Sequence, residues 1–486
     1  MTLLGQAAQP SPLLGPVVAI CTNAFGQVST AGGHYVACDT VNRRFLTVWN
    51  YWNQTNNDID IYGQLVNADN SLHQQMIPIR VLEGSQGYFQ LAFPSPLTFD
   101  ANHQRFMVVW QDNRTNGWQV YSQIVSTDGN LIGSNSRVSP TNQPFYGSWY
   151  YSPTIQYDSV NDRYLVVYIA DAGGGWGPYN VFCQLVDSGG SLPGTPIQIT
   201  WHTNDANYYA FRQNVAYDPA NQRFLVTCDN GYDGYTYGRF IAADGSLIGS
   251  ETAVAHYGDW VNPGVWGSIG LTFDPATGRF LHVWGQNRGQ LINSDGSLFG
   301  TNFIVFNRYF QPTVYGGGIA LTVDTVNHRF IATVNADGFG GGGPIVGQLL
   351  NLDGSWDGAA FYVCSPGQVW FQHSAFAANG TSGLVVWSDR GYPGQPPPGF
   401  YGEKFSVFPI PHVSSVTCSN RLVAMSLDNL APYATHWIER STNLAASSGW
   451  QQIAGPISSV ESTNWSETMT NSFGQAFYRI KSAVPQ

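Results

Sequence analysis

The sequence predicts an all-β fold. Residues 1–409 are expected to form a seven-bladed β-propeller closed by its own N-terminal strand, and residues 410–486 a small β-sandwich of the fibronectin or immunoglobulin type. Three observations predict this fold. A strand-forming motif recurs at nearly constant spacing, the last copy lacks a final strand that the N-terminus can supply, and the composition is rich in glycine and aromatic residues.

The repeated motif reads Asp-x-x-Asn-x-Arg-aromatic-Leu-Val-Val-Trp. Its first copy runs from Asp39 to Trp49, and variants begin at Asp100, Asp158, Asp218, Asp274 and Asp324. Successive aspartates are 61, 58, 60, 56 and 50 residues apart. A seventh, degenerate copy has Ala377 at the aspartate position and Ser382 at the arginine position. We number these copies as repeat units 1 to 7, and each has the length of one four-stranded blade.

Each unit continues with a third strand that keeps one position small: Gly63, Ser122, Cys183, Gly238, Gly289, Gly347 and Gly402. This pattern predicts that a neighbouring strand packs closely there, so that Cys183 is a small buried residue and not a reactive one. Asp-Gly pairs, strong hairpin signals, then lead into a fourth strand, as at Asp128-Gly129 and Asp244-Gly245.

Unit 7 lacks this fourth strand, because the repeat pattern stops at Phe408-Pro409. The N-terminal segment Leu13–Ile20 matches the fourth strand that begins at Leu247 in unit 4. Pairing this segment with unit 7 would close the ring and remove two exposed sheet edges. An open solenoid built from the same repeats is the alternative.

Charge and composition exclude several classes of partner. Only 10% of the residues are charged, the net charge is −11, and Lys404 and Lys481 are the two lysines, so nucleic acid is not an expected partner. No run approaches the roughly 18 apolar residues of a membrane span, and membrane insertion is not expected. The six cysteines lack CxxC spacing, which argues against zinc and redox sites. We expect no cofactor and no metal.

Two polar patterns have an alternative functional interpretation. The Asp and Arg five residues apart could bind acidic sugars, but their repetition in six units favours bracing of each hairpin, with the aspartate accepting turn amides and the arginine pairing across the turn. Four histidines fall near predicted first strands, where a shared metal site is the less favoured alternative: His34, His202, His256 and His373.

Strand direction divides the predicted loops between two faces. The turns joining strands one to two and three to four share one face, which we call the turn face, and they are short and nearly identical. The other face, the loop face, carries long, unequal and aromatic loops. Its candidate ligand-binding residues between strands two and three are Trp52, Trp118, Trp176, Tyr232 and Tyr235. Those between units are Trp149, Trp201, Trp260, Trp266 and Trp370. Many of them could instead fill the core between blades.

The repeats resemble those of extracellular bacterial β-propeller proteins with Tyr-Asp-x-x-Asn-x-Arg-Tyr-Leu-Val-Val-Trp units. The segments Trp437–Leu444, Gly449-Trp450 and Phe477–Ile480 likewise resemble short sandwich modules that end many secreted bacterial proteins. This resemblance implies an extracellular or cell-surface location and a modular architecture, but no reaction.

Two functions remain after these exclusions. Aromatic rings interleaved with Asn, Gln, Gly and Ser are suited to sugar stacking or to a protein interface, which favours an extracellular, non-enzymatic protein that binds glycans, other proteins or copies of itself. The alternative is a carbohydrate-active enzyme with its site in the funnel of the same face. Its paired carboxylates would have to come from different blades, and the sequence does not pair them.

Overall fold

The computed structural model describes residues 13–22, 27–28, 34–53, 58–81, 89–90, 96–112, 114, 118–140, 153–171, 179–200, 210–230, 233–256, 270–284, 287–307, 319–325, 328–335, 344–363, 376–378, 382–389, 399–406, 412–419, 421–428, 430, 435–442, 450–458, 462–468 and 476–483. Within these ranges the regular structure consists of β-strands, which confirms the predicted all-β fold class. The same ranges contain no helix long and apolar enough to cross a membrane.

Each repeat unit forms one antiparallel sheet. Unit 1 comprises β2 (Gln27–Val28), β3 (His34–Asp39), β4 (Arg44–Asn53), β5 (Asp58–Val66) and β6 (Leu72–Arg80). Unit 2 comprises β7 (Phe89–Gln90), β8 (Leu97–Asp100), β9 (Arg105–Asp112), β10 (Gln119–Ser126) and β11 (Leu131–Arg137). Unit 3 comprises β12 (Thr154–Asp158), β13 (Arg163–Asp171), β14 (Tyr179–Asp187) and β15 (Ile197–Gln198).

The remaining units repeat this order. Unit 4 comprises β16 (Ala210–Asp218), β17 (Arg223–Asn230), β18 (Tyr235–Ala242) and β19 (Leu247–His256). Unit 5 comprises β20 (Gly270–Asp274), β21 (Arg279–Trp284), β22 (Arg288–Asn293) and β23 (Leu298–Ile304). Unit 6 comprises β24 (Ala320–Asp324), β25 (Arg329–Asn335), β26 (Ile345–Asn351) and β27 (Phe361–Tyr362). Unit 7 comprises β28 (Phe376–Ala378), β29 (Ser382–Asp389) and β30 (Gly399–Ser406), and its fourth strand is β1 (Leu13–Thr22).

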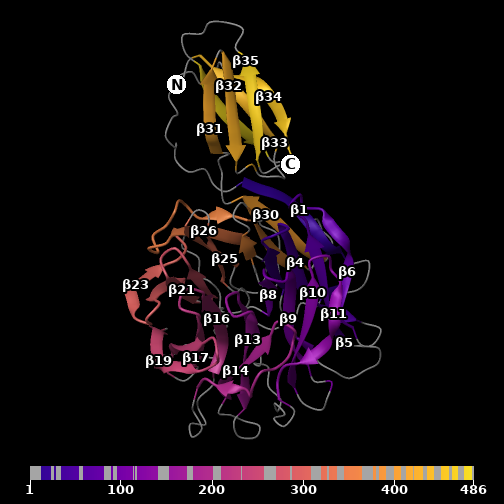
Figure 1. Ribbon diagram of the computed structural model, residues 1–486, viewed down its shortest axis with the longest axis vertical. Coiled ribbons are helices and arrows are strands. Elements are labelled where there is room, and N and C mark those ends of the chain that lie inside the picture. The colour runs from indigo at the N-terminus through magenta and orange to yellow at the C-terminus, as the bar shows by residue number, and fades with distance from the viewer. Residues whose placement is uncertain are drawn as a thin grey trace.

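The first strands of successive units lie against one another. The neighbours in this series are β3, β8, β12, β16, β20, β24 and β28, and β28 also contacts β3. Figure 1 shows the sheets arranged around this set of strands, with β1 beside β30. The fold of the repeat region is therefore propeller-like.

β1 packs in unit 7 as the fourth strands of other units do. It pairs antiparallel with β30, with Val18 opposite Gly402. A Cβ at Gly402 would lie 3.0 Å from Cδ1 of Ile20, which covers the glycine. In unit 1 a Cβ at Gly63 would meet Ile79 at the same distance. The third-strand residue must therefore be small because an apolar side chain of the fourth strand lies directly over it. This holds for β6, which follows in the chain, and for β1, which comes from the N-terminal end.

The motif aspartate organises the turn between strands one and two, as expected. In unit 1, Oδ1 of Asp39 accepts hydrogen bonds from the amides of Val41 and Asn42, both at 2.9 Å. The arginine differs from the expected pairing across its own turn. Arg44 Nη1 donates to the carbonyl oxygen of Thr127 and to Asp128 in unit 2, both at 3.2 Å, so this arginine joins neighbouring units.

The same inter-unit bond recurs around the repeat region. Arg105 of unit 2 donates to the carbonyl oxygen of Ser188, and Arg163 of unit 3 donates to that of Ala243 at 3.2 Å. Unit 7 has Ser382 at the arginine position, and Lys404 on its third strand makes the corresponding bond to the carbonyl oxygen of Asn67 in unit 1. Arg105 also forms the expected pair within its own turn, with Nε 3.0 Å from Asp100 Oδ2.

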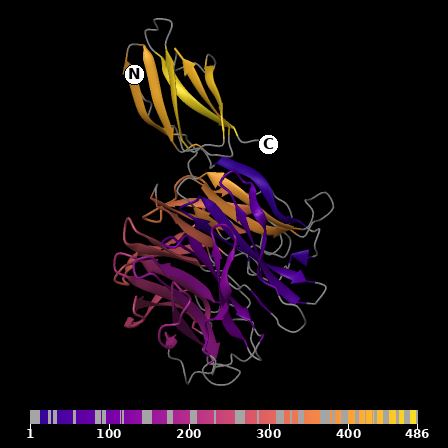
Figure 2. The ribbon, with the colours of Figure 1, turned by 45° about the vertical axis from the view of Figure 1, so that its right-hand side comes forward.

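The C-terminal strands form two sheets. One is ordered β31 (His412–Ser419), β32 (Leu422–Asp428) and β35 (Thr463–Thr468), and the other β34 (Gln451–Ile457), β33 (Thr435–Ser441) and β36 (Phe477–Ala483). Their shared core includes Val423, Met425, Leu427, Leu430 and Ile438. Figure 2 shows these sheets at one end of the molecule, beyond β1. The predicted boundary between residues 409 and 410 lies outside the described residues.

Candidate functional site

The contact of Arg44 with Thr127 and Asp128 places two kinds of turn at the same end of the sheets. Arg44 follows the turn between strands one and two, whereas Asp128 lies in the turn between strands three and four. Because antiparallel strands alternate in direction, the ends of second strands and the starts of third strands lie at the opposite end. The loop face is therefore built around residues such as Asp112, at the end of β9, and Tyr235, at the start of β18.

Three of the ten predicted aromatic site residues lie within the described ranges. Trp52 lies in β4, one residue from its end, Trp118 lies next to β10, and Tyr235 begins β18. The other seven lie outside the described residues: Trp149, Trp176, Trp201, Tyr232, Trp260, Trp266 and Trp370. Trp118 is partly buried and packs against an apolar core to which units 2, 3 and 4 contribute. Its ring contributes to packing, the structural role that the sequence analysis left open.

Tyr235 belongs to a small aromatic surface of unit 4. It is opposite His256, the last residue of β19, and the two ring centroids are 4.2 Å apart with planes inclined at 38°. The ring of Tyr237 is 6.1 Å from that of Tyr235. Both tyrosines are half-buried and His256 is exposed. We call Tyr235, Tyr237 and His256 the unit 4 platform.

Asp233 holds this platform in place from the loop before β18. Its carboxylate accepts hydrogen bonds from the amide of Tyr235 at 2.9 Å, from Asn230 Nδ2 at 2.8 Å and from the hydroxyl of Tyr237 at 2.8 Å. Burial, together with the bond to Asp233, raises the pKa of Tyr237 to about 12. The hydroxyl of Tyr237 therefore stays protonated, and its hydrogen bond to Asp233 fixes the orientation of the Tyr237 ring.

The carboxylates near the platform are those of Asp233 and Glu251. Asp233 is half-buried, and the negative charge of Glu251 also acts on Tyr237. The nearby guanidinium of Arg239 donates to two main-chain carbonyl oxygens, those of Ile199 at 2.7 Å and Gly249 at 3.1 Å. Asp233 and Tyr237 are not among the residues predicted from the sequence. The Asp233-Gly234 pair directly before a predicted strand was the available signal.

A buried ionic cluster joins units 1 and 2 at the loop face. Arg80, at the end of β6, lies 3.8 Å from Asp60 and 3.6 Å from Asp112, and all three side chains are buried. Asp112 also accepts hydrogen bonds from Trp110 Nε1 at 3.1 Å and from Arg114 Nε at 2.7 Å. The structure thus brings two carboxylates from different units to one arginine. Each faces a guanidinium in the core, so the cluster braces the contact between units.

Two of the four histidines of the alternative metal site lie within the described ranges, His34 and His256. His34 begins β3 as predicted, but it is buried against the ring of Phe400, with centroids 4.9 Å apart. His256 ends the fourth strand of unit 4 and does not enter a first strand, which corrects the sequence interpretation. The remaining two, His202 and His373, lie outside the described residues.

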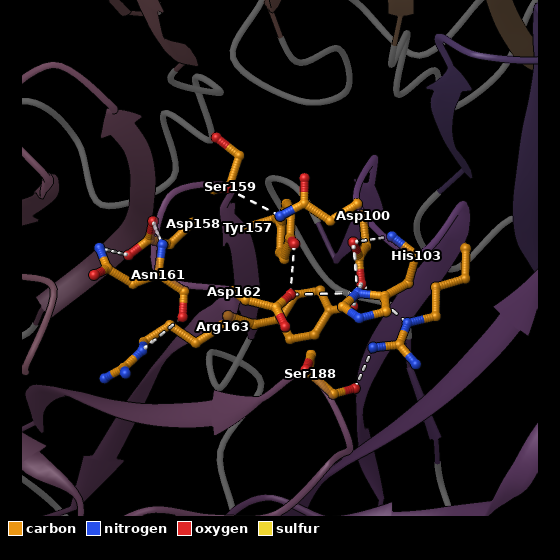
Figure 3. A network of polar contacts seen from close by, with 12 residues as sticks. Asp100, His103, Tyr157, Asp158, Ser159, Asn161, Asp162, Arg163 and Ser188 are labelled. Carbon is orange, nitrogen blue, oxygen red and sulfur yellow. Dashed lines mark hydrogen bonds and ion pairs between the residues drawn. The ribbon is translucent and has the colours of Figure 1, made fainter.

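Another cluster on the turn face has metal-ligand side chains within 4.8 Å of one another: Asp100, His103 and Asp162. Figure 3 shows that it joins the turns of units 2 and 3. His103 Nδ1 lies 3.0 Å from Asp100 and 3.3 Å from Asp162, and Asp162 also accepts a 2.8 Å bond from the hydroxyl of Tyr157. His103 takes the place of the turn asparagine of the repeat.

The hydrogen-bond partners of Asp100 favour a structural role for this cluster. Its Oδ2 accepts from Tyr164 at 2.7 Å and from Arg105 Nε at 3.0 Å. Although burial opposes ionisation, these bonds and the amide of His103 lower the pKa of Asp100. A cation would have to compete with the guanidinium of Arg105 for this carboxylate, so the cluster serves as a link between units.

Comparisons with known proteins give structural similarities without a family. No family model matches the sequence, and no curated protein matches it. Two structures of puromycin hydrolase align with TM-scores of 0.48 at 11% identity, over 84% and 87% of this chain. The chain spans 62% of the length of puromycin hydrolase. An α-L-arabinanase of Penicillium chrysogenum complexed with arabinobiose aligns with a TM-score of 0.45 at 10% identity, over 71% of this chain and 99% of that chain.

Proposed function

We propose that this chain is an extracellular glycan-binding protein, built as a seven-bladed β-propeller that β1 closes. Its binding surface is the loop face, with the unit 4 platform as the part of that surface within the described residues. The observation that carries the proposal is the group of partly exposed rings of Tyr235, Tyr237 and His256, held by Asp233. The ring of first-strand contacts and the pairing of β1 with β30 support the architecture.

The platform has the chemistry that a sugar ring needs. The C–H faces of a sugar pack on aromatic rings, while its hydroxyl groups exchange hydrogen bonds with fixed polar side chains. Asp233 supplies acceptor atoms beside the tyrosine rings, and its hydrogen bond with the buried Asn230 fixes both side chains. Little conformational entropy is then lost on binding, because the rings are already oriented.

The charges around the platform indicate the class of sugar. Asp233 and Glu251 would repel the carboxylates of uronic and sialic acids, and Arg239 is held by main-chain carbonyl oxygens. We therefore propose neutral or amino sugars as ligands. Binding without hydrolysis is favoured because the carboxylates that the described part of the loop face brings together from different units, Asp60 and Asp112, are buried beside Arg80.

The test compares Tyr235→Ala and His256→Ala with a matched control, Tyr362→Ala. Tyr362 is a 47% exposed tyrosine on the fourth strand of unit 6. A glycan array would find ligands, and calorimetry would measure affinity. Loss of a stacking ring should cost about 1–2 kcal/mol, roughly 5–30-fold in affinity, in the platform variants and nothing in the control.

Three results would overturn the proposal. The first is equal binding by the platform variants and the native chain, and the second is an equal loss in the Tyr362→Ala control. The third is a preference for sialylated or uronic-acid glycans, which would contradict the assignment of sugar class. Unchanged thermal melting of the variants shows that any loss of binding is not a loss of folding.

A further inference from the structure

A glutamine on the third strand clamps the fourth strand in most repeat units. In unit 1, Gln64 Nε2 donates to the carbonyl oxygen of Leu65 at 3.2 Å and to that of His73, on the fourth strand, at 2.9 Å. The register of the two strands is interrupted opposite this glutamine, between Gly63 and Leu65. Equivalent pairs of bonds come from Gln123, Gln184, Gln290 and Gln348.

The clamping atom is a hydrogen-bond donor in unit 4 as well. Arg239 follows the small residue Gly238 there, and its Nη2 donates to the carbonyl oxygen of Gly249 at 3.1 Å. Units 1 to 6 therefore all place a side-chain donor against a main-chain carbonyl oxygen that lies in the fourth strand or in the segment just before it. The acceptors are main-chain carbonyl oxygens, which have no hydrogen to offer in return.

Unit 7 departs from this pattern at the strand that comes from the other end of the chain. Its third strand carries Glu403 after the small residue Gly402, at the position of the glutamines. Glu403 is 6% exposed and lies opposite Val17 of β1, where the register shifts between Leu14 and Val17. An ionised carboxylate can only accept hydrogen bonds, whereas a protonated carboxyl group can donate one.

The surroundings of Glu403 favour the protonated form. Burial raises its pKa to about 8. Among the described side chains of β1 and β29, which flank Glu403, the titratable group is the Cys21 thiol, whose pKa burial also raises. Lys404 points to the opposite side of β30, where its Nζ bonds the carbonyl oxygen of Asn67, so it supplies no charge to Glu403.

We propose that Glu403 is a proton-dependent latch on the closing strand, which holds β1 through a donated hydrogen bond when protonated and loosens β1 when ionised. The protonated carboxyl group would donate a hydrogen bond to a main-chain carbonyl oxygen of β1, as the glutamine amide does in five of the other units. Ionisation removes the donor and leaves a buried charge, which is relieved when β1 separates from β30 and water reaches the carboxylate. Loosening of β1 exposes the edge of β30.

The direction of the pH effect follows from proton linkage. The closed form keeps the proton of Glu403 up to about pH 8, whereas an exposed glutamate has a pKa near 4.5. Opening therefore releases a proton between these values and becomes more favourable as pH rises, by up to about tenfold in its equilibrium constant per pH unit. Below about pH 4.5 the latch is tightest, and above about pH 8 the opening constant no longer changes.

Hydrogen exchange of the full chain at pH 5.5, 7.0 and 8.5 tests the latch, after correction for intrinsic exchange rates. Peptides from β1 should lose at least tenfold in protection relative to peptides from β19 and β23 of the same sample. The variant Glu403→Gln restores a permanent donor and should remove this pH dependence. The matched control is Gln348→Glu. In this variant the hydrogen-exchange protection of peptides from unit 6 should become pH-dependent, and the pH dependence of protection in β1 should stay unchanged.

Two outcomes would overturn the latch. One is the same pH-dependent loss of β1 protection in Glu403→Gln as in the native chain. The other is a loss in the native chain that affects β1, β19 and β23 equally, which would show a global effect of pH. The comparison of strands within the native chain keeps the test decisive even where a variant does not fold.

Discussion

The contribution of β1 to stability can be tested at one side chain. Ile20 is 3% exposed and packs in a cluster with Val36, Trp49, Leu384 and Phe400, which brings together units 1 and 7. The change Ile20→Ala removes buried carbon atoms directly above Gly402. A glycine has no side chain with which to fill the resulting cavity, so we expect a loss of about 2–5 kcal/mol in the free energy of unfolding.

Urea unfolding at constant pH measures this loss, and the same strand offers a matched control. Val17 is 52% exposed, and Val17→Ala should change the free energy of unfolding by less than about 0.5 kcal/mol. The reasoning fails if Ile20→Ala unfolds within about 0.5 kcal/mol of Val17→Ala, because β1 would then not pack into the sheet. An equal, large loss in both variants would point to general loss of the strand and also refute the assigned register.

Two further predictions concern acid stability and the C-terminal sheets. Burial lowers the pKa of His282 to about 3, whereas the histidine of the unfolded chain takes up a proton below about pH 6.5, so this group alone lowers the free energy of unfolding by about 2 kcal/mol between pH 7 and pH 5. Urea titrations at both pH values should show that the difference in unfolding free energy between the native chain and His282→Val changes by this amount. A chain that ends at Ile410 should fold as an intact propeller, because the apolar core of β31 to β36 contains no described residue of the repeat units. The absence of a cooperative melting transition for residues 1–410 in calorimetry would contradict this prediction.

The strand framework could be predicted because it depends on short-range patterns. Asp39 and Asn42 form a local turn, and their hydrogen bonds are set by positions two and three residues apart. The matching segment at Leu13 predicted the partner of β30 for a similar reason, since every fourth strand must cover a small residue. Such constraints recur in each unit, so they are visible in a single sequence.

The inter-unit contacts were not predictable in this way, because they join residues about 80 positions apart. Arg44 has the spacing of a partner for Asp39, yet its guanidinium reaches Thr127 in the next unit. Tyr235 was predicted as a site residue, but its pairing with His256 was not, for a related reason. His256 meets Tyr235 only because the last residue of β19 is opposite the first residue of β18, and that register depends on an irregularity within the hairpin.

The repeats place different constraints on the two faces. On the turn face each unit must offer the same carbonyl oxygens to the arginine or lysine of its neighbour, as Ser188 and Asn67 do, so changes there affect a link between units. On the loop face the platform is held within one unit, by Asp233 and Asn230. A change of ring chemistry at Tyr235 therefore leaves every described inter-unit bond of the turn face intact. A repeated scaffold whose units are linked repeatedly at the turn face can therefore vary exposed loop-face residues at little cost in stability.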